Sequence, residues 1–253
     1  MKVLFLFIFT LSIACLSAQN KTDQNGKKQG YWIKYQEGST KKAYEGNFID
    51  DKPEGLFKFY YKDFTTIQSE VYYKDQGKIA HAKLYTMDGK VQAQGKYIQE
   101  LKDSTWDFFD NQGLLLSKEN YSKGKKQGLS QVFYPNGNVS LEKNYKTDTL
   151  DGAFFEFYET KAKKMEAKYI MGKLDGKVSH RYPNGTEAAI QFYKKGQLDG
   201  VWIYKDKEGK ITKKEVYVKG KMLSDKEATE FLNKNSTGKK EQKNNSNQSG
   251  KKK

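Results

Sequence analysis

Cysteine, histidine and proline are scarce in this chain of 253 residues. The single cysteine is Cys15, so no intramolecular disulfide can form, and the fold must be held together by packing and hydrogen bonds. The only histidines are His81 and His180, which argues against a zinc site or a histidine-based catalytic triad. Because there are only three prolines, long stretches of the chain are free to form uninterrupted strands.

Arginine is scarcer still, although the chain is strongly basic. It occurs once, at Arg181, while the formal net charge is +15. Proteins that recognise specific bases rely on the bidentate arginine fork, which lysine cannot replace. We therefore interpret the positive charge as a solvated lysine surface and expect no specific nucleic-acid partner.

Long apolar runs are also rare, and the clearest one lies at the N-terminus. Lys2 is followed by an apolar stretch over residues 3–13 and then by small residues up to Ala18. This pattern is typical of a secretory signal peptide over residues 1–18, cleaved between Ala18 and Gln19. The stretch is shorter than the roughly 20 residues that a membrane-spanning helix needs. We expect an exported protein, located in the periplasm, at the outer membrane or outside the cell.

Cys15 leaves a second route of maturation open. The segment from Ser12 to Cys15 resembles a bacterial lipobox, and cleavage before Cys15 would leave a lipidated N-terminus. Ser12 stands where that motif usually has leucine. Plain secretion is therefore the favoured interpretation, and a lipoprotein is the alternative.

What the sequence has in abundance is a repeat, rich in aromatic residues. From residue 30 to residue 221 one pattern restarts eight times, at intervals of 24 or 25 residues, and we call each stretch a frame. The frames start at Gly30, Gly55, Ala80, Ser104, Gly128, Gly152, Gly176 and Gly200. Two residues after these starts lie Trp32, Phe57, Ala82, Trp106, Ser130, Phe154, Val178 and Trp202. Seven residues before the later starts, and before Ser224, lie Phe48, Tyr73, Tyr97, Tyr121, Tyr145, Tyr169, Tyr193 and Tyr217. A fixed period of this length indicates an array whose units bury their apolar faces against one another.

Each frame is expected to form a β-hairpin. In the fifth frame, Pro135-Asn136-Gly137 separates two strand-like segments and favours a turn, because proline presets φ while asparagine and glycine tolerate the left-handed region. A second turn glycine, such as Gly124, lies four residues before the next start. Hairpins in series predict an all-β array over residues 19–223. We expect an elongated single antiparallel sheet of about eight hairpins and sixteen strands, open rather than closed into a barrel.

The position two residues after each start has a rhythm of its own. From Phe57 onward it alternates between large and small side chains. Packing could cause this alternation, because a bulky ring beside a small side chain fills space that two rings would contest. Duplication of paired frames would leave the same trace. The packing explanation predicts that Ser130→Trp lowers the melting temperature.

The array stops at Ser224, where a capping-box pattern runs to Glu227. Ala228, Phe231 and Leu232 follow at helical spacing, so we predict a short capping helix within residues 224–234, folded over the last hairpin. Residues 235–253 contain no aliphatic or aromatic side chain, and we expect a disordered tail. That tail is either a solubilising extension or an electrostatic tether to an anionic surface.

The repeat resembles a known family. Residues 44–48 followed by residues 55–57 are similar to the MORN (membrane occupation and recognition nexus) repeat, and residues 193–202 are similar to its bacterial variant. That variant occurs in exported proteins and in proteins called YwqK-family antitoxins. The resemblance covers roughly residues 24–223, although the frames at Ala80 and Ser104 lack the initial glycine. It implies a ribbon of hairpins that contacts proteins or membrane surfaces, and the antitoxin label implies a partner toxin.

We expect no catalytic, cofactor or metal site. His81 and His180 lie about four frames apart and cannot meet in an extended array. Asp151, Asp175 and Asp199 recur just before frame starts, where they cap turns or, alternatively, form a row that binds a cation. A glycosidase with paired carboxylates would need a cleft that a ribbon does not naturally provide.

Together, these features lead to one hypothesis and one alternative. The hypothesis is a non-enzymatic, exported repeat scaffold that binds a protein partner or an anionic surface of the cell envelope and touches membranes only peripherally. The alternative is a toxin-neutralising protein, of the antitoxin or immunity type, that uses the same ribbon.

Overall fold

The computed structural model describes residues 19–62 and 65–234, and the chain divides into two compact units between Glu100 and Leu101. The first unit contains the first three frames, and the second contains the other five. Residues 1–18, with Cys15 and Ala18, and the tail 235–253 lie outside the described residues. The signal peptide, its cleavage before Gln19 and the disordered tail therefore remain predictions.

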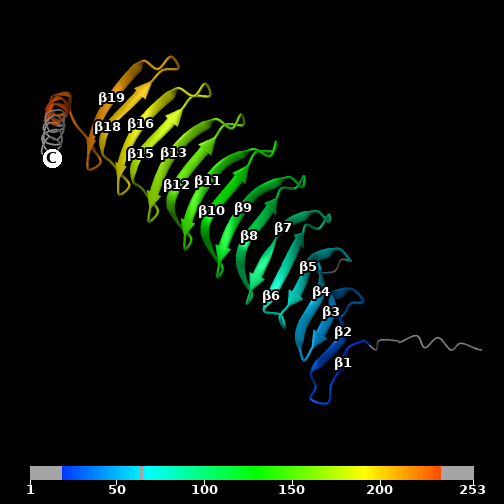
Figure 1. Ribbon diagram of the computed structural model, residues 1–253. Helices are drawn as coiled ribbons and strands as arrows, with labels where there is room; N and C mark the ends of the chain where they lie inside the picture. The colour runs from blue at the N-terminus through cyan, green and yellow to red at the C-terminus, as the bar shows by residue number, and fades with distance from the viewer. Residues whose placement is uncertain (1–18, 63–64, 235–253) are drawn as a thin grey trace, which may run out of the picture. The chain divides into compact units, whose positions relative to one another are not determined.

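The first unit is an antiparallel sheet in which each strand pairs with the next one along the chain (Figure 1). Its strands are β1 (Lys21–Thr22), β2 (Lys28–Tyr35), β3 (Lys42–Ile49), β4 (Lys52–Tyr60), β5 (Ile67–Lys74), β6 (Ile79–Tyr85) and β7 (Val91–Ile98).

The second unit repeats the same arrangement over its five frames and is likewise open and antiparallel. Its first strands are β8 (Leu101–Phe109), β9 (Leu115–Ser122), β10 (Lys125–Phe133), β11 (Val139–Lys146), β12 (Thr149–Phe157) and β13 (Lys163–Ile170). Its last strands are β14 (Lys173–Leu174), β15 (Gly176–Arg181), β16 (Glu187–Lys194), β17 (Gln197–Leu198), β18 (Gly200–Lys205), β19 (Ile211–Val218) and β20 (Lys221–Met222). The expected all-β class and the antiparallel hairpins are confirmed in both units.

The described residues form twenty strands where sixteen were expected, and each extra strand has a simple origin. β14 and β15 both pair with β13, and together they correspond to one expected strand. The strand is interrupted at Asp175, whose N–H donates a hydrogen bond to the carbonyl of Lys168 (2.9 Å). Asp199 separates β17 from β18 in the same way. β1 and β20 are two-residue strands that pair with β2 and β19.

Most frame-start glycines lie where the strand pairing shifts or is interrupted. Gly128 has φ +79°, and the pairing of β10 with β9 shifts between Lys126 and Ser130. Gly30, Gly55, Gly152, Gly176 and Gly200 also have positive φ values, which glycine adopts without the steric penalty of a Cβ. Ser104 keeps this conformation without being glycine (φ +60°).

The third frame is different because its start, Ala80, lies in a regular strand. β5 and β6 pair from Ser69 to Lys74 without any shift of register. The residue that would form a bulge lies instead in a wider turn, where Asp75, Gln76 and Gly77 all have positive φ values. The bulge is therefore absent at Ala80, where the turn has taken up one residue, whereas Ser104 keeps the positive φ without being glycine.

Neighbouring hairpins are joined at their tips by side chains. The hydroxyl of Tyr61 donates to the carbonyl of Tyr85 in the next hairpin (2.6 Å). Tyr134, Tyr158 and Tyr182 occupy the same position of their frames and donate to Phe157, Arg181 and Lys205. The aromatic residues in this position therefore stabilise the array through hydrogen bonds as well as through packing.

Asp151, Asp175 and Asp199 each accept a hydrogen bond from the next such turn along the chain. Each carboxylate accepts a backbone N–H twenty residues further along, from Met171 (3.3 Å), Lys195 (2.9 Å) and Lys219 (3.3 Å) respectively. This is the turn-capping role considered for them, with the cap placed on the turn of the next hairpin.

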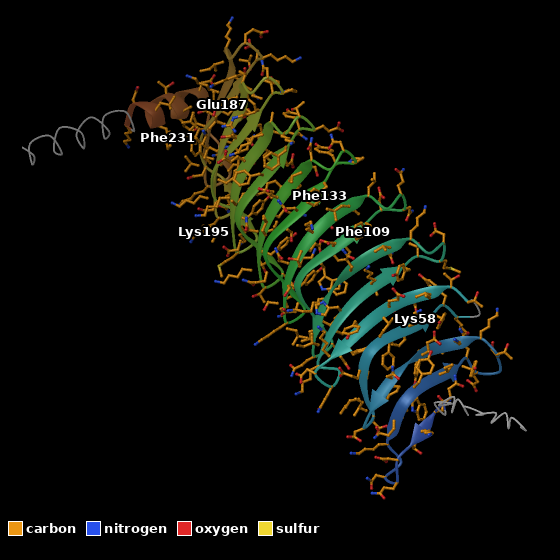
Figure 2. The ribbon with its side chains drawn as sticks, turned by 45° about the vertical axis from the view of Figure 1, so that its right-hand side comes forward. Lys58, Phe109, Phe133, Glu187, Lys195 and Phe231 are labelled. Atoms are coloured by element: carbon orange, nitrogen blue, oxygen red, sulfur yellow. The ribbon has the colours of Figure 1, made fainter. Side chains whose placement is uncertain are left out.

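Residues 225–234 form the expected short helix after β20 (Figure 2 labels Phe231). The carboxylate of Glu227 accepts the backbone N–H of Ser224 (2.9 Å) and its hydroxyl (2.7 Å), as a capping box requires in part. These two bonds lower the pKa of Glu227. Ala228 and Phe231 are half-buried, but Leu232 is exposed, so the helix buries less of its apolar face than the spacing indicated.

Candidate functional site

Alternating side chains give each sheet two faces of different chemistry. One carries the column of aromatic residues found seven positions before the frame starts. We call it the tyrosine face, and it is marked by Phe48, Tyr73 and Tyr97 in the first unit and by Tyr121, Tyr145, Tyr169, Tyr193 and Tyr217 in the second. The other is the charged face, which carries Glu45, Lys58, Glu70 and Lys83 in the first unit and Asp107 and Lys118 in the second.

The tyrosine face contains the best-buried residues of the array. Phe57, Trp106 and Trp202 are 2%, 0% and 6% exposed. The small residues at the same position of other frames are buried equally well, at 3% for both Ala82 and Ser130. Trp32 and Phe154 are only half-buried. Within each unit, large and small members of this column therefore lie in one packed layer, which is the condition that the packing explanation of their alternation requires.

Lysine side chains cover the aromatic rings in several frames. The ammonium of Lys102 lies 4.5 Å from the ring centre of Trp106 and 5.1 Å from that of Tyr121, within cation–π range. Lys28 lies over Trp32 and Phe48 in the first frame. Burial lowers the pKa of Lys102, as expected for an ammonium held over apolar rings.

A carboxylate lies among these groups on the tyrosine face. Glu119 accepts hydrogen bonds from Lys126 (2.8 Å) and from the hydroxyl of Tyr121 (2.5 Å). Burial disfavours the Glu119 carboxylate, but these bonds outweigh it and lower its pKa. Burial and the bond to Glu119 raise the pKa of Tyr121. The ionised acid is fully engaged within the frame and is poorly suited to proton transfer.

The charged face is largely self-satisfied. Cross-strand pairing places Glu45 opposite Lys58, Lys58 opposite Glu70, and Glu70 opposite Lys83, so charges of opposite sign alternate across the sheet (Figure 2 labels Lys58). In the second unit, Lys118 forms an ion pair with Asp107 (3.0 Å). Such pairs stabilise an antiparallel sheet and leave fewer unpaired charges for a partner.

Glu45 lies at the centre of a hydrogen-bonded cluster on the charged face. It accepts hydrogen bonds from Lys42 (2.6 Å), Tyr60 (2.5 Å) and Tyr31 (2.7 Å). Burial alone would raise the pKa of Glu45, but the three donors lower it to about 2. Burial and the bond to Glu45 raise the pKa of Tyr31 to about 12. These three hydrogen bonds give Glu45 a structural role.

The tyrosine face opens into a hollow at the third frame. The hollow measures about 280 Å³. Tyr73 on β5 and Tyr97 on β7 both pair with Ala80 on β6, so two rings flank one methyl group. In a bulged frame, two residues occupy this place, as Lys126 and Gly128 do opposite Tyr121 and Tyr145.

The walls and rim of the hollow are well defined. Phe57 contacts the Tyr73 ring edge-on, with centres 5.2 Å apart, and so holds one wall in place. Val71 and Ala80 are buried in the floor. Lys78 and Glu100 lie at the rim. Burial raises the pKa of Tyr73, with smaller contributions from the Glu100 charge and from Tyr97, so both phenols stay neutral at physiological pH.

The sequence predictions and this geometry agree on the scaffold but not on the hollow. Of the residues predicted to be structural, the glycines Gly30, Gly55, Gly128, Gly152, Gly176 and Gly200 have positive φ values, Phe57, Trp106 and Trp202 are buried, and Trp32 is half-buried. The hollow was not predicted. Its signals were the missing glycine at Ala80 and the turn glycine at Gly77, which lies three rather than four residues before the frame start.

Sequence comparisons with known proteins identified no relative of this chain. A scan against protein-family models and a search of curated proteins found no match for this chain. Within residues 19–62 and 65–234, no group of three or more His, Cys, Asp or Glu is placed to hold a metal ion. In the same part of the chain, no helix has the length and apolar character needed to cross a bilayer.

Proposed function

We propose that the protein is a non-enzymatic, exported repeat scaffold whose tyrosine face binds a partner at the cell envelope. The observation that carries this proposal is the recurrence of half-buried tyrosines at one register position in successive frames, opening at Ala80 into a hollow. Half-buried tyrosines suit recognition because they offer a rigid apolar ring and a polar edge at low entropic cost.

The distribution of charges supports the tyrosine face as the binding face. Acids of the charged face are engaged by neighbouring lysines and tyrosines, as at Glu45 and Asp107. On the tyrosine face, lysines such as Lys28 and Lys102 lie over the rings. That arrangement favours a partner with apolar and anionic or hydroxyl groups, such as an envelope protein or an anionic envelope surface. The resemblance of residues 44–48 to the MORN repeat supports an interaction role as well.

Cell fractionation tests the export half of the proposal. Mature protein should be recovered with the envelope or the medium, and mass spectrometry should find an N-terminus at Gln19, or a lipidated Cys15 in the alternative. Recovery of the uncleaved chain only in the cytoplasm, bound to another protein, would contradict export and favour the toxin-neutralising alternative.

Co-sedimentation with envelope fragments tests the binding half. Purified protein should sediment with fragments, and Tyr97→Ala should reduce that fraction. Tyr72→Ala changes an exposed tyrosine of the charged face, 47% exposed, and should leave the fraction unchanged. Equal losses in the two variants would show that the tyrosine face is not the binding face.

A further inference from the structure

We propose that the hollow between Tyr73 and Tyr97 is a binding site for one neutral pyranose ring of a glycan. This inference rests on the proposed function, because it names the ligand class of the tyrosine face. The hollow lies wholly within the first unit, and its parts come from three consecutive strands, β5, β6 and β7.

The spacing of the walls selects a single ring. Tyr73 and Tyr97 are two strands apart, and neighbouring strands are separated by about 4.8 Å, so their backbones lie roughly 10 Å from each other. A ring placed midway between them over Ala80 would lie about 5 Å from each wall, and this exceeds the optimal carbon contact of about 3.5–4.0 Å by the room that a puckered ring and its axial hydrogens take up. The volume of about 280 Å³ is just below the range of about 300–1,000 Å³ for drug-sized ligands, which suits one ring rather than a larger molecule.

The polar groups at the rim select a sugar over an aromatic side chain. Lys78 offers ammonium donors, and Glu100 offers carboxylate acceptors, as the hydroxyls around a pyranose require. The aromatic ring of a phenylalanine or tyrosine in a peptide has at most one such hydroxyl. The puckered chair of a pyranose is also thicker than a flat aromatic ring and fills the space between two walls more completely.

The charges at the rim select a neutral sugar. Lys78 and Glu100 carry opposite charges, so the hollow itself has no excess of either sign. Lys78 contacts Asp75 only at 3.8 Å, and both side chains are more than half exposed, so its ammonium can turn to a ligand at little cost. A uronic acid would gain from Lys78 but be repelled by Glu100.

The site depends on the local departure from the repeat. Frames with a bulge place a second side chain between successive tyrosines, such as Lys126 beside Tyr121. In the third frame, the regular strand leaves Ala80 alone between the two rings. The absence of the bulge therefore creates the slot, while Phe57 on the neighbouring strand keeps the Tyr73 wall upright.

Ligand-observed NMR and calorimetry with the full chain would test the proposal. The probes are cellohexaose and chitohexaose, two neutral β-1,4-linked oligosaccharides, with oligogalacturonate as the anionic comparison. We expect saturation transfer to the ring protons of at least one neutral probe. Binding should weaken by about tenfold or more in Tyr97→Ala and in Ala80→Leu, which fills the hollow and keeps both walls.

Tyr72→Ala is the matched control, because it removes a neighbouring tyrosine from the charged face, and it should change binding less than about twofold. Thermal unfolding of every variant separates loss of binding from loss of fold. Failure of both neutral probes to bind the wild-type chain overturns the proposal. So does unchanged binding in folded Ala80→Leu and Tyr97→Ala, or preferential binding of oligogalacturonate. These assays use purified protein, so their failure leaves the fractionation test of export unaffected.

Discussion

The second and third frames share the same hairpin topology but differ in how their side chains pack on the tyrosine face. In the second frame, Phe57 is 2% exposed, and its ring lies 5.1 Å from Phe48 and 5.2 Å from Tyr73, in edge-on contacts. In the third frame, Ala82 stands at the same position, and the strand lacks the bulge. The backbone pairing survives both choices. The same hairpin topology can therefore be filled by a ring in one frame and open into a hollow beside Ala80 in the next.

The largest effect is expected from Phe57→Ala. The ring contacts four other aromatic side chains and is almost fully buried, so its removal leaves a cavity as well as lost burial. Urea denaturation should show a loss of about 3–5 kcal/mol in the free energy of unfolding. Leu56→Ala, at an exposed position on the adjacent residue, is the control and should cost far less. Similar losses in both variants would remove the distinction between the two faces.

Gly46→Ala should have the next largest effect. Gly46 pairs with Trp32 on β2, and a Cβ added to it would overlap the ring of Phe57. We expect a loss of about 1–3 kcal/mol, the usual range for overpacking. In a Phe57→Leu background, the same substitution should cost less, because the smaller side chain can move aside. A double-mutant cycle without coupling would show that Phe57 does not lie over Gly46.

The frame-start bulges should respond to substitution with opposite signs. Gly128 has φ +79° with nothing within 4 Å of an added Cβ, so Gly128→Ala isolates the conformational penalty of about 1–2 kcal/mol. Ser104 has φ +60°, and Ser104→Gly should relieve part of that penalty and raise the melting temperature. If Gly128→Ala stabilises the protein, the assignment of Gly128 to a left-handed bulge is wrong.

The hydrogen bonds between hairpin tips should make a smaller contribution. Tyr61→Phe removes the bond from the second hairpin to the carbonyl of Tyr85, for an expected loss of about 0.5–1.5 kcal/mol. Thr86 occupies the same position in the third frame, but its hydroxyl bonds within its own turn. Thr86→Val therefore removes bonds within one turn only and leaves the bond from Tyr61 to Tyr85 intact. Hydrogen exchange of the amides of residues 79–85 reports on the difference.

On the charged face, the contribution of Glu45 to stability should vary with pH only in acid. The pKa of Glu45 falls from 4.5 to about 2 on folding, so the folded state favours the ionised form. The resulting stability is complete above pH 4.5 and is lost as the pH falls towards 2. Glu45→Gln should flatten the pH dependence of the melting temperature across that window. An unchanged acid profile in the variant would contradict the role of Glu45.

Much of the scaffold was predictable because its signals are local and repeated. Turn residues such as Asn136 and Gly137 act through their own backbone, and eight copies in phase identify the hairpins. Asp175 was predicted to cap a turn, but its partner lies twenty residues away, and no local pattern indicates that bond. The tip bond of Tyr61 was missed for the same reason.

The hollow was less predictable because it arises from something missing. Ala80 in the sequence only weakened the repeat pattern. Its consequence depends on the shift of one residue from strand to turn at Gly77 and on the register that brings Tyr73 and Tyr97 opposite one alanine. Sequence periodicity gives the average frame, whereas this site is formed by a departure from that average.

Thermal unfolding of Ser130→Trp tests the central claim most directly. That claim is that, within each unit, the side chains two residues after the frame starts form a packed column in which large and small residues alternate. Ser130 is 3% exposed, and its hydroxyl has no hydrogen-bond partner in the described part of the chain. Ser130→Ala, the control, should therefore change the melting temperature little. Ser130→Trp should lower it by about 4 °C or more, because an indole has no space in the column. An unchanged melting temperature in Ser130→Trp would contradict the account.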